Sequence, residues 1–228
     1  ELGHEVIMVS SDLDKLKKAE KEVKGKSKVI KCDLGNEKEC FELYEKVKDE
    51  NIDIIINNAG FGDHGEFTDT DLDKELNMID VNIRAVHILT KLFLKDFVKR
   101  DSGYILNVSS TAAYQPGPLM ATYYSTKAYV LRLTTSIYEE LRRSKSNVKV
   151  SVLCPGPVKT NFNKVAHVNF DIKSVSSDYV AKYAIDKMFK NKLVIIPTFY
   201  MKALIFFSKL SPTKLAARIA FNIQDKKR

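Results

Sequence analysis

The feature that most restricts the fold of this chain is a regular alternation of short apolar runs with longer amphipathic segments. Apolar runs of strand length lie at residues 4–10, 28–32, 53–57, 104–108, 148–154 and 193–196. Segments with a helical period lie between them, at residues 12–24, 36–49, 71–98, 123–144 and 178–190. Unbroken apolar runs are typical of strands that are buried on both faces, as in a parallel sheet. The alternation therefore predicts an α/β protein with a doubly wound parallel sheet.

The domain organisation follows from length and charge. The chain has 228 residues, of which 44% are hydrophobic, enough for one sizeable core, and no linker or repeat marks a second one. We expect a single domain at residues 1–197, followed by a basic, amphipathic helical extension at residues 198–228. Most of the formal net charge of +8 lies in this extension. Because the body has no basic face interleaved with aromatic residues, nucleic-acid binding is not predicted.

The cysteines indicate a compartment and argue against a metal site. Cys32, Cys40 and Cys154 are odd in number and form no Cys-x-x-Cys or Cys/His cluster. This pattern favours neither a disulfide framework nor bound zinc, and it predicts a reducing, cytoplasmic location. No run approaches the roughly 20 apolar residues that a membrane span needs. Any membrane contact is therefore expected to be peripheral.

Tyr123 and Lys127 form the first candidate catalytic pair. Four residues apart in a predicted helix, they share one face, where the ammonium lies near the phenol oxygen. A nearby cation favours the phenolate and lowers the pKa of a tyrosine toward working pH. A lone Tyr-x-x-x-Lys spacing is also common in surface pairs, so the interpretation depends on the motifs around it.

Three more motifs occur in a fixed order around this pair. Ser110 follows the run 104–108, at the carboxyl end of a predicted strand, where α/β sheets bind ligands. Asn-Asn-Ala-Gly at residues 57–60 ends an earlier strand, Asn82 lies in the next helical segment, and Pro-Gly-Pro-Val-Lys-Thr at residues 155–160 ends a later strand. Together these motifs resemble those of the short-chain dehydrogenase/reductase family, from residue 1 to about residue 196. The resemblance implies a Rossmann-like fold and hydride transfer between a nicotinamide cofactor and a carbonyl or alcohol.

The resemblance also implies four catalytic roles. Tyr123 matches the general acid/base that gives a proton to the carbonyl oxygen. Lys127 matches the residue that lowers the tyrosine pKa and binds the nicotinamide ribose. Ser110 matches the hydroxyl that orients the substrate oxygen, and Asn82 matches the residue that holds a water in the proton relay.

The cofactor site implied by the resemblance is spread over several strand ends. Besides Tyr123 and Lys127, it comprises Asp33 and Leu34 in the adenine pocket, Asn58, Ala59 and Gly60 on the adenosine side, and Pro155, Gly156, Val158 and Thr160 in the nicotinamide loop. Ser10 and Ser11 stand at the end of a strand where an Asp would favour NAD. Without that carboxylate, and with Lys15 nearby, the sequence favours NADP(H), with NAD(H) as the alternative.

The chain departs from the family at its beginning. The glycine-rich turn that binds the pyrophosphate is not in the sequence, and Glu1, Leu2 and Gly3 match the end of a helix with a C′ glycine. We expect that a strand, a turn and most of a helix, roughly 20 to 25 residues, precede residue 1. In the order 3-2-1-4-5-6 the missing strand is central, so a gap is predicted between the strands at residues 4–10 and 53–57.

Residues 60–65 fit the pattern Gly-x-Gly-x-x-Gly but are not predicted to hold a phosphate. Acidic residues crowd this segment, and the next helix begins only near residue 70, too late for its N-terminus to reach a pyrophosphate. We interpret it as a rim of the substrate cleft. His64 in this segment and His167 in a later loop are candidates for substrate contact.

The substrate is predicted to be a lipophilic small molecule. Apolar side chains occur where the family places its substrate cleft, although they equally fit an ordinary core: Phe61, Tyr114, Met120, Phe162 and Phe170. The alternative to an enzyme is a non-catalytic protein that senses a dinucleotide, or binds a membrane surface, on the same fold.

The C-terminal extension allows two interpretations. Residues 199–210 are aromatic and apolar, and Ser211 and Pro212 offer an N-cap and a first-turn proline for a second, amphipathic helix. One side of that helix carries Leu215, Ala216, Ile219, Ala220 and Ile223. These segments either cover the enzyme's own core or its partner in a homo-oligomer, or they anchor the protein at an anionic membrane surface.

Overall fold

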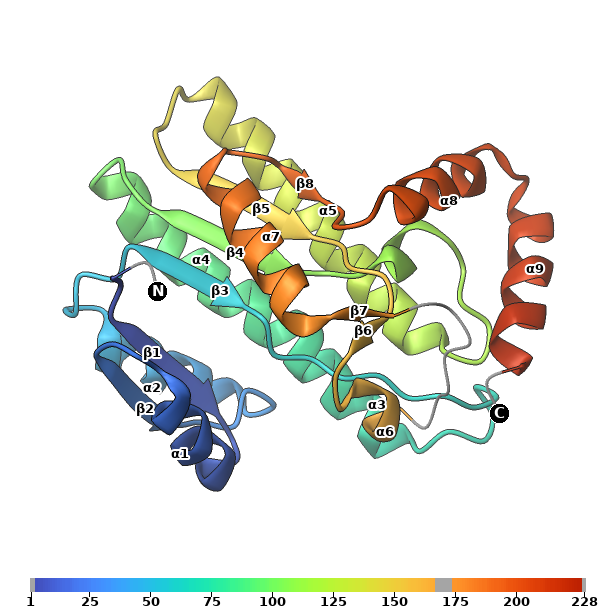
Figure 1. Cartoon of the computed structure of the whole chain (residues 1–228), viewed down its shortest axis with the longest axis horizontal. Helices are drawn as coiled ribbons and strands as arrows, with labels where there is room; N and C mark the ends of the chain where they lie inside the picture. Colours follow the sequence, from blue (N-terminus) through green and yellow to red (C-terminus); the bar gives the residue numbers. More distant parts are fainter. Residues whose placement is uncertain (1–2, 167–173, 227–228) are drawn as a thin grey trace.

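The computed structural model describes residues 3–166 and 174–226, and it has parallel strands flanked by helices (Figure 1). The strands that the sequence predicts are all present, at β1 (Val6–Ser10), β2 (Ser27–Lys31), β3 (Ile54–Asn57), β4 (Tyr104–Val108), β5 (Lys149–Leu153) and β8 (Val194–Ile195). They form two parallel sheets with the strand orders β1-β2 and β3-β4-β5-β8. The α/β fold class and the parallel arrangement are confirmed.

The helices follow the predicted segments, with Asp or Asn side chains at several N-caps. They are α1 (Leu13–Glu22), α2 (Glu37–Val47), α3 (Leu72–Ile79), α4 (Val86–Lys99), α5 (Ala121–Arg143), α7 (Ser177–Phe189), α8 (Phe199–Leu210) and α9 (Thr213–Asp225). Asp12, Asn36 and Asp71 accept backbone hydrogen bonds that begin α1, α2 and α3. None of the helices in the described ranges is long and apolar enough to cross a membrane.

The sequence prediction is wrong in some local details. The segment 71–98 is interrupted between α3 and α4 by a π-helical turn, η1 (Asp80–Ala85). Ser211 ends α8, and Pro212 takes the N-cap position of α9, where its missing N–H costs nothing. Four short elements were not predicted, the 3₁₀ turn η2 (Thr111–Tyr114), β6 (Val158–Lys159), α6 (Phe162–Val165) and β7 (Val175–Ser176).

The sheet is interrupted between β1 and β3, as predicted. β1 pairs with β2 and β3 pairs with β4, and the pairings of the described strands do not join β1 to β3. A cavity of about 1730 Å³ lies between them, lined by Val6, Ile7 and Val9 on one side and by Ile54, Ile55 and Ile56 on the other. Gly3 has a φ of +79°, in keeping with the predicted C′ glycine, while Glu1 and Leu2 lie outside the described residues.

Helices cover both faces of the larger sheet. Ile105 of β4 packs with Phe93 and Phe97 of α4, whereas the next residue, Leu106, packs with Met188 of α7 on the opposite face. Ile105 and Leu106 are both buried, which explains why the run at residues 104–108 shows no polar alternation.

A chain of buried polar side chains joins β3, β4, α4 and α5. Asn57 and Asn107 lie opposite each other in the β3–β4 register. Asn57 Nδ2 donates to Asn107 Oδ1 at 2.8 Å and to Thr90 Oγ1 at 3.0 Å, and Asn107 Nδ2 donates to Thr134 Oγ1 at 2.9 Å. All four residues are buried. A register shift of one residue between β3 and β4 would break the Asn57–Asn107 bond and leave buried polar atoms without partners.

We predict that Asn107→Ala lowers the free energy of unfolding by roughly 3 kcal/mol, because it leaves the Asn57 amide and the Thr134 hydroxyl with fewer buried partners. Urea denaturation of both proteins measures this difference. Asn222→Ala, on the exposed side of α9, is the control, and its effect should stay within about 0.5 kcal/mol. Equal stability of Asn107→Ala and the wild type would contradict the role of the polar chain.

Candidate active site

Lys127 and Tyr123 lie one turn apart at the start of α5, against the end of β4. Lys127 Nζ donates to the Val108 carbonyl at 3.1 Å and lies 5.8 Å from the centre of the Tyr123 ring. Ser109 Oγ donates to the Lys127 carbonyl at 2.7 Å. The carboxyl end of β4 is therefore tied to both the backbone and the side chain of Lys127, which holds α5 over the strand end.

Ser110 joins the end of β4 to the Tyr123 phenol. Its hydroxyl caps η2 by accepting from Ala112 N at 3.1 Å and lies 3.5 Å from the Pro155 carbonyl. It also lies close enough to Tyr123 to lower the pKa of the phenol, but burial has the larger effect and raises this pKa to about 12. The serine, the tyrosine and the start of the loop after β5 therefore meet at one point.

Lys127 is a buried cation. Only 5% of its surface is exposed, and burial lowers the pKa of its ammonium group from 10.5 to about 8. Burial disfavours both the Lys127 cation and the Tyr123 phenolate. A polar group brought close to either residue would therefore favour its charged form. Two neighbouring groups with strongly shifted pKa values mark a candidate functional site.

Asn82 lies in the π-helical turn and clamps the loop after β3 to α5. Its side chain accepts from Phe61 N at 3.1 Å, and it donates to the Phe61 carbonyl at 2.9 Å and to Thr126 Oγ1 at 3.0 Å. Thr126 in turn donates to the Tyr123 carbonyl at 2.7 Å. A single extra backbone residue per turn re-aims a side chain, and such turns often occur at functional sites.

Gly60 and Gly62 let this loop approach the candidate catalytic residues. A Cβ at Gly60 would lie 2.8 Å from Asn82 Oδ1 and 3.0 Å from Lys127 Nζ. A Cβ at Gly62 would lie 2.8 Å from the Phe162 ring and 3.1 Å from the Tyr123 ring. Because α3 begins only at Leu72, the glycine pattern at residues 60–65 is not followed by a helix N-terminus.

Six residues predicted on the adenosine side of a dinucleotide share one cavity. They come from the ends of three strands and all line the cavity of about 1730 Å³: Ser10, Ser11, Asp33, Leu34, Asn58 and Ala59. Ligands of open α/β sheets bind at this carboxyl edge. The hydroxyl, amide and carboxylate groups, together with the open approach at Gly60, fit a nucleoside. In the described part of the chain no glycine-rich turn faces this cavity.

The residues predicted in the nicotinamide loop follow β5, and this loop begins beside Ser110. Pro155 accepts from Thr111 N at 2.9 Å, and Val158 pairs with Val175. Thr160 Oγ1 accepts from Phe162 N at 3.2 Å. A Cβ at Gly156 would lie 2.9 Å from the Met201 side chain, so α8 contacts this loop.

Some of the predicted substrate-contact residues surround Tyr123 and others do not. Met120 and Phe162 pack with Tyr123 and Tyr124. Tyr114 packs in a core cluster beside the sheet, and Phe61 lines the large cavity. Phe170 and His167 lie outside the described residues. His64 points toward α9 instead, where its Nε2 lies 3.2 Å from the Gln224 carbonyl.

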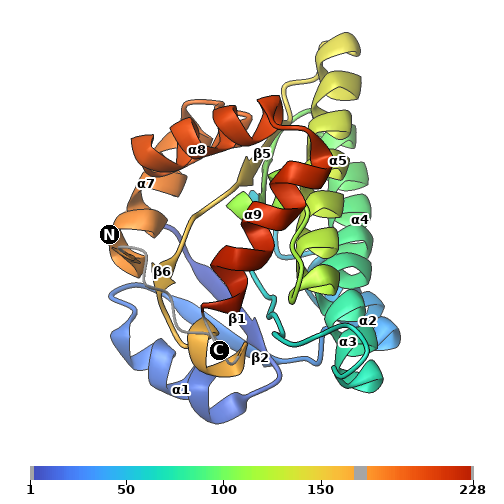
Figure 2. The ribbon, with the colours of Figure 1, turned by 90° about the vertical axis from the view of Figure 1, so that its right-hand side faces the viewer.

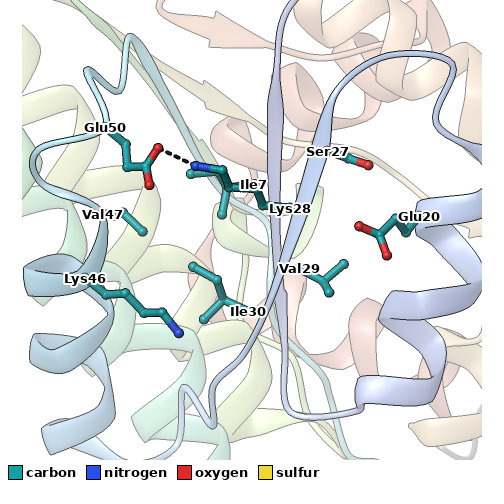
Figure 3. A pocket seen from close by; sticks show the side chains of 9 residues that line it. All are labelled: Ile7, Glu20, Ser27, Lys28, Val29, Ile30, Lys46, Val47 and Glu50. Atoms are coloured by element: carbon teal, nitrogen blue, oxygen red, sulfur yellow. Dashed lines mark hydrogen bonds and ion pairs between the residues drawn. The ribbon is translucent and has the colours of Figure 1, made fainter.

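A second pocket, of about 430 Å³, lies between β2, α1 and the end of α2 (Figure 3). Lys28 Nζ and Glu50 Oε2 form an ion pair of 2.6 Å at its edge. None of its lining residues is a predicted site residue. We therefore assign it no part in the candidate site.

The contacts of Thr126, Tyr124 and Gln224 were not predicted from the sequence. Thr126 lies between the predicted residues Tyr123 and Lys127, and this position in the sequence was the available signal. Gln224 Nε2 donates to the Tyr124 hydroxyl from α9, a hundred residues away in sequence. No local pattern indicates that contact.

We predict that the lowered pKa of Lys127 makes stability depend on pH. Below pH 8 the lysine is protonated in both the folded and unfolded states, and the cost of burying its charge is fully present. Between its folded pKa of about 8 and its ordinary value of 10.5 the unfolded state binds more protons, so stability rises with pH. Relative to Lys127→Met, the wild type should gain up to roughly 3 kcal/mol over this window.

Urea denaturation of the two proteins across the window measures this gain. Lys18→Met, at an exposed lysine of α1, is the control and should show a constant difference from the wild type. A difference between wild type and Lys127→Met that is flat or falls with pH would show that Lys127 is not a desolvated cation.

Known proteins share this fold and are similar to this chain in sequence. The family model for short chain dehydrogenases matches residues 1–169. Dehydrogenase/reductase SDR family member 11 of Gallus gallus is 30% identical over 178 residues, which cover 73% of this chain and 70% of the relative. Very-long-chain 3-oxoacyl-CoA reductase of Bos taurus is 33% identical over 177 residues, which cover 74% of this chain and 56% of the relative.

A solved structure agrees with these matches. The short-chain dehydrogenase from Sphingobium yanoikuyae, in complex with NADPH, superposes with a TM-score of 0.79 and 25% identity. The superposition covers 89% of this chain and 81% of that chain. From its family match, its relatives and its Rossmann-like fold, this chain belongs to the short-chain dehydrogenase/reductase family of oxidoreductases.

Proposed function

We propose that this enzyme moves a hydride between a nicotinamide dinucleotide and the carbonyl or alcohol of a lipophilic small molecule, with Tyr123 as general acid/base. The observation that carries the proposal is the position of Ser110 and Tyr123 side by side at the end of β4, next to the buried ammonium of Lys127. A hydroxyl, a phenol and a desolvated cation at one strand end match the demands of proton transfer to a carbonyl oxygen.

Each residue has a separate role in this proposal. The nicotinamide supplies or takes up the hydride when it is bound. Tyr123 donates its phenol proton to the carbonyl oxygen, and Ser110 donates a hydrogen bond that holds this oxygen in place. Lys127 favours the phenolate that remains and binds the ribose hydroxyls. Asn82 holds the loop after β3 against α5, and its part in a water relay stays a prediction.

The dinucleotide is proposed to extend along the carboxyl edge of the strands, from Ser10 and Asp33 to Ser110. Its adenosine end is assigned to residues that line the cavity: Ser10, Ser11, Asp33, Leu34, Asn58 and Ala59. Gly60, which follows Ala59, is also assigned to the adenosine side, and the nicotinamide end is assigned to Tyr123, Lys127, Pro155, Gly156, Val158 and Thr160. Support comes from the close approach at Gly60, where a side chain would meet Lys127.

The lipophilic character of the substrate is supported by the apolar packing of Met120 and Phe162 around Tyr123. The bovine relative is named for very-long-chain 3-oxoacyl-CoA, which supports including long-chain carbonyl compounds among the test substrates. The cytoplasmic location, the homo-oligomeric state and the division at residue 197 stay predictions.

We predict that Tyr123→Phe lowers turnover by about 100-fold to 10,000-fold, because it keeps the ring and removes the proton donor. Dinucleotide binding, measured by calorimetry on the complete protein, should persist. Lys127→Ala should weaken both turnover and binding. Tyr138→Phe, further along the same helix, is the control and should retain turnover.

Two results would contradict this assignment. Turnover of Tyr123→Phe within a few-fold of wild type would remove the proposed general acid. Dinucleotide binding by the wild type without reduction of any ketone, aldehyde, acyl thioester or steroid would instead support a non-catalytic sensor.

For the cofactor we propose a preference for NADP(H) over NAD(H). No carboxylate stands at Ser10 or Ser11 to repel a 2′-phosphate, and the charge of Asp12 is offset by Lys15, whose Nζ lies 2.8 Å from its carboxylate. The Michaelis constant should be lower for NADPH than for NADH. Ser11→Asp should raise the constant for NADPH by at least about fivefold, the effect of one like charge at about 4 Å in water.

Steady-state kinetics with both cofactors checks this preference. The constant of Ser11→Asp for NADH should stay close to the wild-type value, since NADH has no 2′-phosphate. A wild-type enzyme with the lower Michaelis constant for NADH would overturn the preference.

A further inference from the structure

The outer face of α8 carries large apolar side chains that are exposed to solvent. Phe199 is 84% exposed, Phe206 is 60% exposed, Phe207 is 65% exposed and Leu210 is 69% exposed. Met201 and Ile205, on the opposite side of the same helix, are buried. Helix α8 is therefore apolar on both sides, but only one side is covered by the described chain. Contiguous exposed apolar surface of this kind marks an interaction site.

Helix α9 also has an uncovered apolar side. Ala216, Ala220 and Gln224 recur every four residues and are buried against the body. Leu215, Ile219 and Ile223 are 49%, 48% and 43% exposed. The predicted apolar side of this helix is thus divided, with its alanines covered and its larger side chains uncovered. Both helices lie on the side of the molecule that faces the viewer in Figure 2.

We call this surface the tail surface, and it consists of Phe199, Phe206, Phe207, Leu210, Leu215, Ile219 and Ile223. Its charged neighbours are nearly all cations. Within residues 198–226 they are Lys202, Lys209, Lys214, Arg218 and Lys226, against Asp225. Apolar side chains flanked by Lys and Arg complement a lipid boundary with anionic headgroups, and a second positively charged copy would be repelled.

The same helices contact the catalytic region from their inner sides. Gln224 of α9 hydrogen-bonds to the Tyr124 hydroxyl, and Tyr124 packs against Tyr123 with ring centres 6.1 Å apart. Lys209 Nζ of α8 lies 5.1 Å from the ring of Tyr114, the last residue of the η2 turn that Ser110 caps. A ligand on the outer side of the tail is therefore separated from the Tyr123 region by single helices.

We propose that α8 and α9 dock the enzyme on an anionic lipid surface through the tail surface, next to the catalytic region, so that lipid-dissolved carbonyl substrates reach Tyr123 from the membrane. The docking is inferred from the exposed apolar side chains and from the basic residues beside them. The substrate source rests on the proposed function.

Flotation of the complete protein with vesicles of equal parts phosphatidylcholine and phosphatidylglycerol tests the docking. The wild type should bind, and added salt or pure phosphatidylcholine should weaken binding because headgroup attraction is screened or lost. Phe206→Gln with Phe207→Gln should reduce partitioning by at least about tenfold, since two aromatic side chains no longer enter the lipid.

Two matched controls separate the tail surface from general effects. Phe67→Gln with Leu72→Gln removes two apolar side chains that are 69% and 66% exposed elsewhere, and this variant should bind like the wild type. Lys202→Gln with Lys214→Gln should weaken binding to anionic vesicles, whereas Lys17→Gln with Lys18→Gln on α1, of equal charge, should weaken it far less.

The proposal is overturned if the wild type fails to bind anionic vesicles at low salt. It is also overturned if ultracentrifugation shows a dimer that Phe206→Gln with Phe207→Gln dissociates, because a second copy would then cover the tail surface. Turnover of a water-soluble ketone by this variant should equal that of the wild type. Vesicle binding without any turnover would leave the docking intact and contradict only the proposed function.

Discussion

The positions of the candidate catalytic residues depend on the buried hydrogen-bond chain from Asn57 through Asn107 to Thr134. It joins two neighbouring strands to α5 just before the points at which the strands end and the functional loops begin. Asn58 directly follows one member, Ser109 and Ser110 follow another at the end of β4, and Lys127 lies two turns from the third. Since amide and hydroxyl groups are satisfied in only one register, the sheet edge and α5 are aligned together.

Next to this chain, the site holds a buried cation, Lys127, that solvent would stabilise better. Burial raises the pKa of Tyr123 and lowers that of Lys127, so neither the phenolate nor the ammonium is favoured by the protein alone. Burying the Lys127 ammonium lowers the stability of the fold, but it provides a cation that water does not screen. Such a cation interacts strongly with a phenol or a ligand hydroxyl placed beside it. Function and stability thus oppose each other at Lys127.

Much of the fold was predictable because the strands are buried on both faces and their apolar runs are unmistakable. The ends of these runs also gave Ser110, Asn58 and the loop at residue 155, since polar residues directly after a buried strand share one sheet edge. The π-helical turn at Asn82 was not predictable, because it is a shift in backbone pairing rather than a residue preference. The contact of Gln224 with Tyr124 depends on how α9 returns to the body, which no local pattern encodes.

The position of β4 has a consequence for how slowly its backbone opens to solvent. It pairs with β3 on one edge and with β5 on the other, and α4 and α7 cover its two faces. Its backbone amides are therefore expected to exchange with deuterium only when the whole sheet unfolds. Ser110 follows directly after this strand and its short exit, so the hydroxyl proposed to orient the substrate is attached to one of the most protected segments of the described chain.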